Sequence, residues 1–154
     1  MSFTISKESP LGADLALLMA RHTADMHADT PPESIHMMDA GQLAVPQVAF
    51  FVLREAGVAQ AMGAFKRLSG SHAEIKSMHV LAEARGRGLS KAMLDHLILE
   101  ARAAGVTQLS LETGVQPTFV AARALYTKAG FTECPPFEGY AEDPNSVFMT
   151  RSLA

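Results

Sequence analysis

The sequence predicts a single α/β domain of three layers, in which a mixed β-sheet lies between helices. The chain has 154 residues, and one domain typically has roughly 100–200. In the first half, three consecutive strand-like segments separated by short turns predict antiparallel pairing. In the second half, helical and strand-like segments alternate, which completes a mixed sheet with helices on its faces.

The N-terminal part is expected to contain one strand and one or two helices. Residues 3–6 read as a short strand, which Pro10 ends. Residues 11–27 are predicted to form a helix, because one face would carry Leu11, Leu15, Leu18, His22 and Met26. The segment Thr30-Pro31-Pro32 ends this helix. Residues 33–38 are expected to form a short second helix, since proline is tolerated in a first helical turn.

Three strands follow, at residues 47–54, 58–68 and 73–81. They are rich in aromatic and β-branched residues, and short turns containing Gly57 and Gly70 separate them. In the third strand, simple alternation places Ile75, Ser77 and His79 on one face, and Glu74, Lys76, Met78 and Val80 on the other.

The second half of the chain alternates helices and strands. Residues 88–104 and 118–129 have helical spacing of apolar residues, and each segment is followed by a glycine that suits a helix end. Strands are predicted at 107–113, 131–134 and 146–152. Residues 135–145, rich in proline, glycine and acidic residues, are expected to form a loop.

Composition excludes several classes of protein. The net charge of −3 provides no basic field for nucleic acid. A single cysteine, Cys134, excludes an internal disulfide and a cysteine-based zinc cluster, and nothing nearby in sequence would activate its thiol. The first residues lack the pattern of a signal peptide, and no apolar run approaches the roughly 20 residues of a membrane span. We therefore expect a cytoplasmic protein without a membrane partner.

A glycine–arginine turn precedes the predicted helix 88–104. It reads Arg85-Gly86-Arg87-Gly88-Leu89-Ser90. Backbone N–H groups are unpaired at a helix start, glycines allow close approach, and arginines donate charged hydrogen bonds, so this turn suits a pyrophosphate. It lacks the spacing of a dinucleotide fingerprint or a Walker A loop. A solvated basic helix start is the alternative interpretation.

The residues around this turn resemble the acetyl-CoA-binding core of the GNAT superfamily of N-acetyltransferases. The family loop reads Gln/Arg-x-x-Gly-x-Gly/Ala, and here Arg85 and Gly88 match, with Ser90 at the last position. Downstream, Ala122-Arg123-Ala124-Leu125-Tyr126 followed by Gly130-Phe131 is similar to a second family element. Phe119 stands where members often have asparagine. Segments 30–36, 111–114 and 142–149 further resemble a subgroup of small bacterial members.

The resemblance implies a mixed, mostly antiparallel sheet whose fourth and fifth strands splay apart, with acetyl-CoA as co-substrate in the resulting V. The backbone of the third strand of the hairpin series would pair with the pantetheine arm, and the glycine–arginine turn would hold the pyrophosphate. The implied cofactor contacts are Met78, His79, Val80, Arg85, Gly86, Arg87, Gly88, Leu89, Ser90, Phe119 and Ala122.

The resemblance also implies catalytic residues. Tyr126 is the expected general acid for the leaving thiolate, because a phenol has similar basicity. Glu74 is the expected general base, acting through water; a surface glutamate paired with Lys76 is the alternative. Glu112, at the end of the fifth strand, competes for the same role.

Other polar residues are assigned to the acceptor. His22, Glu33, His36 and Glu112 are expected to line the acceptor pocket, where a glutamate would favour a cationic substrate. Tyr140 and Asn145 would contact substrate if the loop 135–145 covered the pocket; a solvated loop is the alternative. We expect no metal site, because His22 and His27 point about 140° apart on a helix and no zinc-binding pattern occurs.

Together these residues predict an N-acetyltransferase that transfers acetyl directly from acetyl-CoA to a small primary amine in a ternary complex. Three alternatives stay open at this point. One is an acetyltransferase for protein lysine or N-termini, and another is a non-catalytic acyl-CoA-binding module. A metal-dependent hydrolase is disfavoured by the histidine spacing. The sequence leaves the oligomeric state open, a homodimer included.

Overall fold

The computed structural model describes residues 2–154 and has one seven-stranded sheet in the order β1-β2-β3-β4-β5-β7-β6. Neighbouring strands are antiparallel except β4 and β5. The strands are β1 Thr4–Lys7, β2 Val48–Glu55, β3 Val58–Arg67, β4 His72–Val80, β5 Gln108–Gly114, β6 Thr132–Glu133 and β7 Ser146–Ser152. The predicted fold class, a mixed and mostly antiparallel sheet, is confirmed.

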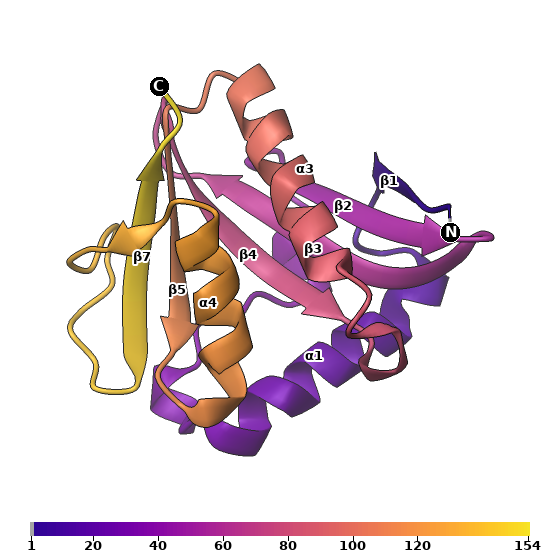
Figure 1. Cartoon of the computed structure of the whole chain (residues 1–154), viewed down its shortest axis with the longest axis horizontal. Coiled ribbons are helices and arrows are strands. Elements are labelled where there is room, and N and C mark those ends of the chain that lie inside the picture. The colour runs from indigo at the N-terminus through magenta and orange to yellow at the C-terminus, as the bar shows by residue number, and fades with distance from the viewer. Residues whose placement is uncertain (1) are drawn as a thin grey trace.

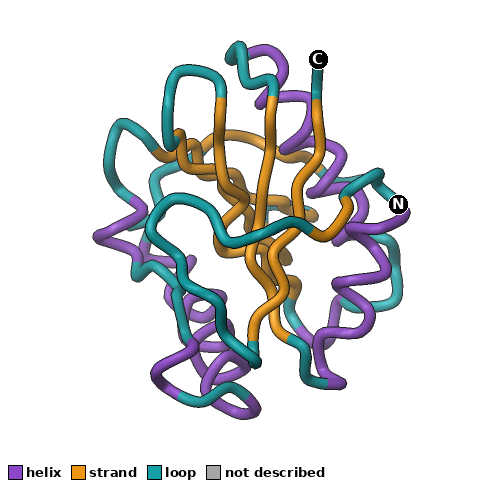
Figure 2. Tube along the Cα trace, turned by 90° about the vertical axis from the view of Figure 1, so that its left-hand side faces the viewer, coloured by secondary structure: helices purple, strands orange, loops and turns teal. Residues whose placement is uncertain are grey.

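Helices cover both faces of the sheet (Figure 1). They are α1 Ala16–Asp29, the single-turn α2 Ala40–Leu43, α3 Leu89–Ala103 and α4 Val120–Lys128. Figure 2 shows helices on either side of the strands, with α3 and α4 on the face opposite α1. None of the helices among residues 2–154 is long and apolar enough to cross a membrane.

The core lies mainly between the sheet and α3. Leu94, Leu97 and Ala101 are fully buried at helical spacing on one side of α3. Gly63 of β3 lies beneath this helix, and a Cβ there would stand 2.8 Å from Cγ of Met93. The glycine therefore lets the helix approach the sheet closely.

The strands β4 and β5 pair only at their amino ends. Their parallel register covers His72–Glu74 against Gln108–Ser110 and then stops. Figure 1 shows the two strands starting side by side and diverging toward their carboxyl ends, with α1 crossing near the open end. The predicted splay of the fourth and fifth strands is thus confirmed. It leaves unpaired strand edges facing one another across a gap.

A β-bulge in β4 reverses its side-chain alternation. Met62 pairs with His79 and Ala64 with Lys76, so two residues of β4 oppose one of β3. Ser77, in the bulge, has a φ of 57°. The predicted faces are therefore wrong beyond Lys76, because the bulge turns Met78 toward α4 and His79 toward α1.

The segment between α1 and β2 also differs from its prediction. The expected helix at 33–38 is instead the 3₁₀ turn Pro32–Ser34 followed by irregular chain. The actual helix is α2, begun by a reciprocal capping box between Asp39 and Gln42. The first long helix starts at Ala16, after a 3₁₀ turn, and Leu11 is exposed. The remaining predicted elements are present, with ends that shift by a few residues.

Candidate active site

A cavity of about 660 Å³ occupies the gap between β4 and β5. Its walls are the diverging ends of both strands, the C-terminal half of α1, the start of α3 and one side of α4. It is continuous from the glycine–arginine turn at one end, here the cradle end, to Glu74, Lys76, His36 and Glu112 at the other, here the acceptor end.

The cradle end is built mainly from backbone. Gly86 and Gly88 both have a φ of +79°, and a Cβ on either would meet nothing within 4 Å. The turn therefore adopts a left-handed conformation that glycine alone takes freely, and it leaves open space beside the N-terminus of α3. Leu89 is buried and fixes the helix start, whereas Ser90 is exposed at the cavity. This open backbone cradle fits the pyrophosphate of a nucleotide cofactor.

The two arginines of the turn have different surroundings. Arg85 donates from Nε to the carbonyl of Val80 at 3.1 Å, and its Nη2 lies 2.9 Å from Oδ2 of Asp25 on α1. Arg87 is bonded to Glu55 and is not among the residues that line the cavity. Arg85 is therefore the arginine that the fold directs to the cavity.

Tyr126 extends from α4 toward the gap. The side chain is buried, its hydroxyl lies 3.9 Å from Sδ of Met78, and its ring packs edge-on against Phe131. Burial, together with the nearby charge of Glu112, raises the pKa of Tyr126 to about 12. The phenol is therefore protonated at neutral pH and lines the cavity as a hydrogen-bond donor. Phe119 and Ala122 line the same wall.

Glu74 is held in a closed polar cluster. It is 4% exposed, its Oε2 accepts from the hydroxyl of Tyr140 at 2.6 Å, and the same oxygen lies 3.1 Å from Nζ of Lys76. Lys76 also donates to the Tyr140 hydroxyl at 2.7 Å and to the carbonyl of His36 at 3.1 Å. Glu74 is thus the partner of a cation, as the alternative interpretation of this residue anticipated.

Glu112 lies in the cavity without an ion pair to Lys or Arg among the described residues. Burial raises the pKa of Glu112 to about 7, although the Ser146 hydroxyl and the charge of Lys76 favour the ionised form. The Glu112 and Tyr126 side chains line the same cavity. A carboxyl that titrates near neutral pH can accept a proton under working conditions.

Two histidine side chains of the cavity wall contact each other, one from α1 and one from β4. The rings of His22 and His79 pack edge to face with centroids 5.3 Å apart. Burial lowers the pKa of His22 to about 4, with a further decrease from His79, and burial likewise lowers the pKa of His79. Both imidazoles are therefore neutral at pH 7. Asp25 Oδ2 lies 3.9 Å from Nδ1 of His79, and Nε2 of His79 is buried without a hydrogen-bond partner.

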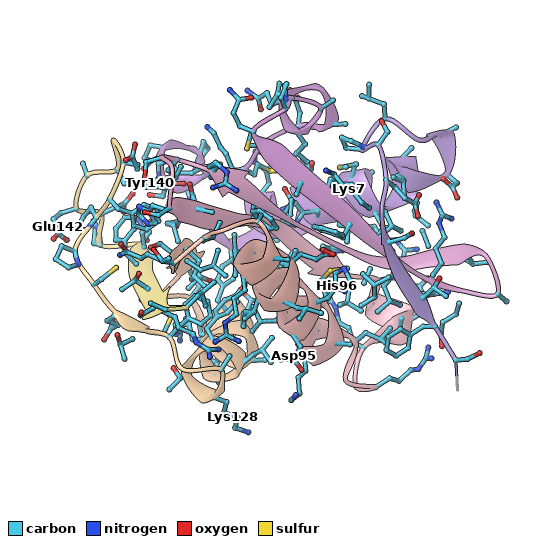
Figure 3. All side chains as sticks on the ribbon, turned by 90° about the horizontal axis from the view of Figure 1, so that it is seen from above. Lys7, Asp95, His96, Lys128, Tyr140 and Glu142 are labelled. Atoms are coloured by element: carbon cyan, nitrogen blue, oxygen red, sulfur yellow. The ribbon has the colours of Figure 1, made fainter. Side chains whose placement is uncertain are left out.

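The three segments that resemble a bacterial subgroup come together beside the acceptor end. Ser34 donates to Asp143 at 2.6 Å, and Asn145 donates through Nδ2 to the Ser34 hydroxyl at 3.3 Å. The backbone of Val115, just after the segment 111–114, donates to the carbonyl of Asn145 at 3.2 Å. These contacts pin the loop 135–145, and Figure 3 shows Tyr140 near the strands while Glu142 stands at the outer edge of that loop.

The predicted acceptor residues do not all reach the cavity. His22, His36 and Glu112 line it, whereas Glu33 is exposed on the 3₁₀ turn and does not. Tyr140 and Asn145 are not among the lining residues. Tyr140 donates a hydrogen bond to Glu74, which lines the cavity, and Asn145 donates one to Ser34.

One lining residue, Asp25, was not predicted from the sequence. It lies three residues after His22 and so on the same side of α1, and this helical spacing is the signal that could have found it. Among residues 2–154 no group of three His, Cys, Asp or Glu side chains has metal-binding geometry.

Comparison with known proteins agrees with this geometry. The model of the acetyltransferase (GNAT) family matches residues 17–131. The chain belongs to the GNAT family. The uncharacterized N-acetyltransferase YsnE of Bacillus subtilis is 42% identical over 92% of this chain and 94% of its own length. An IAA acetyltransferase of Azospirillum brasilense is 39% identical over 97% of each chain.

Solved GNAT structures share the fold. A structure of the acyl-CoA N-acyltransferase fold from Klebsiella pneumoniae has a TM-score of 0.81 at 29% identity, covering 99% of this chain and 98% of the other. YncA of Salmonella typhimurium, solved with its cofactor acetyl-CoA, has a TM-score of 0.74 at 19% identity, covering 100% of this chain and 95% of the other. This chain is an acyltransferase of the GNAT family.

Proposed function

We propose that this GNAT protein transfers the acetyl group of acetyl-CoA to the primary amine of a small molecule, directly and within a ternary complex. The observation that carries the proposal is that Tyr126 and Glu112 line one cavity, one as a protonated phenol and the other as a carboxyl with a pKa of about 7. A proton donor and a proton acceptor on either side of one gap suit acyl transfer from a thioester to an amine.

Acetyl-CoA supplies the activated thioester. The backbone of Gly86 to Ser90 would hold its pyrophosphate, with Arg85 as a charged donor. The unpaired edge of β4 at Met78, His79 and Val80 would accept the pantetheine arm as an added strand, with Phe119 and Ala122 across the gap. Arg87, paired with Glu55, would contribute through charge rather than contact.

Tyr126 would hold the proton that the leaving sulfur requires. A phenol that is protonated at neutral pH can donate to a thiolate when the carbon–sulfur bond breaks. Burial prevents water from competing for this proton.

Glu112 would accept the proton that the acceptor ammonium must lose before its nitrogen lone pair attacks. Two observations favour Glu112 over Glu74 for this role. The Glu112 carboxyl has no lysine or arginine bonded to it within residues 2–154, whereas Glu74 is bonded to both Lys76 and Tyr140. We assign Glu74 the role of orienting Lys76 and Tyr140.

The name of the Azospirillum relative adds one specific acceptor to test. That protein is an IAA acetyltransferase and is similar to this chain over nearly its whole length. IAA is therefore included in the assay beside a set of small primary amines, and turnover of IAA without turnover of any primary amine would contradict the proposal.

The test measures thiol release from acetyl-CoA and the mass of the product for each acceptor. We expect an acetylated amine and, for Tyr126→Phe, a kcat reduced by roughly 100-fold or more, as for loss of a general acid. Saturating acetyl-CoA should raise the melting temperature of both proteins equally, since about 2.7 kcal/mol is gained at a hundred times the Kd. Tyr140→Phe, which changes the only other tyrosine in the same way, should reduce kcat by less than tenfold.

Two further outcomes contradict the proposal. Stabilisation by acetyl-CoA without thiol release to any small acceptor would leave the non-catalytic module. Turnover with lysine peptides but not with small amines would indicate a protein acetyltransferase instead.

A further inference from the structure

The carboxylates that line the cavity are unequally paired. Glu74 is paired with Lys76 at the acceptor end, and Asp25 with Arg85 beside the cradle. Glu112 at the acceptor end and Asp29, the last residue of α1, also line the cavity, and neither is bonded to a lysine or arginine in the described part of the chain. The cavity wall therefore has two carboxyl groups without a cationic partner.

Lys76 is engaged within the protein. An ammonium group has three donors; Lys76 directs two of them to the His36 carbonyl and the Tyr140 hydroxyl, at 3.1 and 2.7 Å, and its Nζ forms an ion pair with Oε2 of Glu74 at 3.1 Å. Its side chain is only 12% exposed. The charge of this lysine is thus already balanced by Glu74, and a substrate carboxylate gains little from it.

One ring nitrogen of His79 has no partner. The Nδ1 of His79 faces Asp25 at 3.9 Å, so the charge of that carboxylate favours the tautomer with the proton on Nδ1 and a lone pair on Nε2. This Nε2 is buried, has no partner, and belongs to a residue that is 7% exposed and lines the cavity. A buried acceptor without a donor is costly, so a ligand that supplies an N–H group there is favoured.

We infer that the acceptor is a cationic amine with no carboxylate beside its reactive nitrogen, and that a second positive charge at its far end is favoured by Asp29. The inference rests on the proposed function and narrows its substrate class. It follows from the occupation of Lys76 within the protein, the carboxylates of Glu112 and Asp29, and the unpaired Nε2 of His79.

The physical reason is desolvation. A substrate carboxylate that enters this end loses its hydration and finds the Lys76 ammonium already occupied, while it stands near acidic side chains of like charge. An ammonium group instead meets carboxylates and an imidazole lone pair. Of two compounds that differ only in one α-carboxylate, the one without the carboxylate should therefore bind better and react with the higher kcat/KM.

The experiment compares two matched pairs of compounds, namely pentylamine against L-norleucine and phenethylamine against L-phenylalanine, and each pair differs only in the α-carboxylate. For each pair we expect kcat/KM, from thiol release, to be at least tenfold higher for the compound without the carboxylate. The same pairs are titrated calorimetrically against the protein saturated with CoA, so that binding is measured without turnover.

The variant Asp29→Asn tests whether Asp29 favours a second ammonium group at the far end of the acceptor. We expect this variant to raise the KM for cadaverine (pentane-1,5-diamine) three- to tenfold and to leave the KM for pentylamine unchanged, because only the diamine has a second ammonium. Glu142→Gln, at the outer edge of the loop, removes the same charge away from the cavity and should change neither value.

The outcomes separate the two proposals. Equal or better use of the amino acids, or tighter binding of them, overturns the inference and leaves the proposed function intact. Binding of the amines alone without any thiol release supports the inference and contradicts the proposed function. Binding of neither member of any pair overturns the inference.

Discussion

The two ends of the cavity are built in different ways. The cradle end is a short stretch of consecutive residues, in which Gly86 and Gly88 shape the backbone and the start of α3 supplies N–H groups. The acceptor end is a set of side chains from distant segments, in which Glu74, Lys76 and Tyr140 form one hydrogen-bonded cluster.

This difference affects what each end can recognise. Backbone N–H groups at a helix start suit any phosphate, so the cradle can serve a common cofactor without regard to the acceptor. What the acceptor end recognises depends instead on the charged side chains that have no partner of opposite charge in the folded protein. In the described chain these are the carboxylates of Glu112 and Asp29. Changes at the two ends should therefore affect different kinetic constants.

The largest effect is expected at Glu112. Glu112→Gln should reduce kcat/KM by roughly 100-fold, because an amide cannot accept the ammonium proton. In the wild type, activity should rise as pH passes through about 7, since only the ionised carboxyl acts as a base and its pKa lies there. The variant should lack this rise, and its melting shift with acetyl-CoA should be retained. A rise at the same pH in the variant would assign the titration to another group.

The second largest effect is expected on acetyl-CoA affinity, when both arginines of the glycine–arginine turn are replaced. The double variant Arg85→Ala, Arg87→Ala should weaken acetyl-CoA binding roughly 10- to 100-fold. The main reason is the loss of the charged hydrogen bond from Arg85 to phosphate, worth about 1.5–3 kcal/mol before solvent screening, and Arg87 would add only the effect of its charge. The measurement is the melting temperature as a function of acetyl-CoA concentration. Lys128→Ala, which removes an exposed cation at the end of α4 that does not line the cavity, is the control. Equal weakening by both variants would indicate a diffuse charge effect and not a cradle.

A smaller effect is expected from Tyr140. Tyr140→Phe removes the hydroxyl that joins Glu74 to Lys76 and should lower the free energy of unfolding by about 1–2 kcal/mol, as for a buried hydrogen bond to a charged group. Chemical denaturation measures this change. Unchanged stability would mean that water replaces the hydroxyl. Acetyl-CoA affinity should be unaffected, because the residue supports only the acceptor end.

The smallest effect tests the backbone character of the cradle. Gly86→Ala adds a methyl group in open space but at a φ of +79°, so we expect a loss of about 1 kcal/mol from conformation alone. Gly70→Ala also enters open space, but without a positive φ, and should not destabilise the protein. Thermal unfolding of the two variants compares them directly. Equal stability would show that the turn does not depend on glycine.

Local patterns predicted most of the fold and the cradle. The spacing of Leu94 and Leu97 identified α3, and the glycine–arginine turn predicts an anion site at the start of that helix. Predictions from local patterns were wrong where the conformation depends on a segment that is distant in sequence. Alternation in β4 failed at Ser77 because the pairing with β3 inserts a bulge, and the helix expected at 33–38 is replaced by a turn whose Ser34 bonds to Asp143.

The family and the sheet with its covering helices could be predicted from the sequence, because the helix and strand patterns and the family motifs lie in short segments of chain. The roles of Tyr126 and the cradle residues stay predictions. Only the tertiary structure decided that Lys76 is occupied by Glu74 and Tyr140, and that Glu112 is not paired with a cation in the described chain. The physical reason is that a charge is neutralised by whatever the fold places within a few ångströms. At the acceptor end those partners can be distant in sequence, as Tyr140 is from Lys76, 64 positions away along the chain.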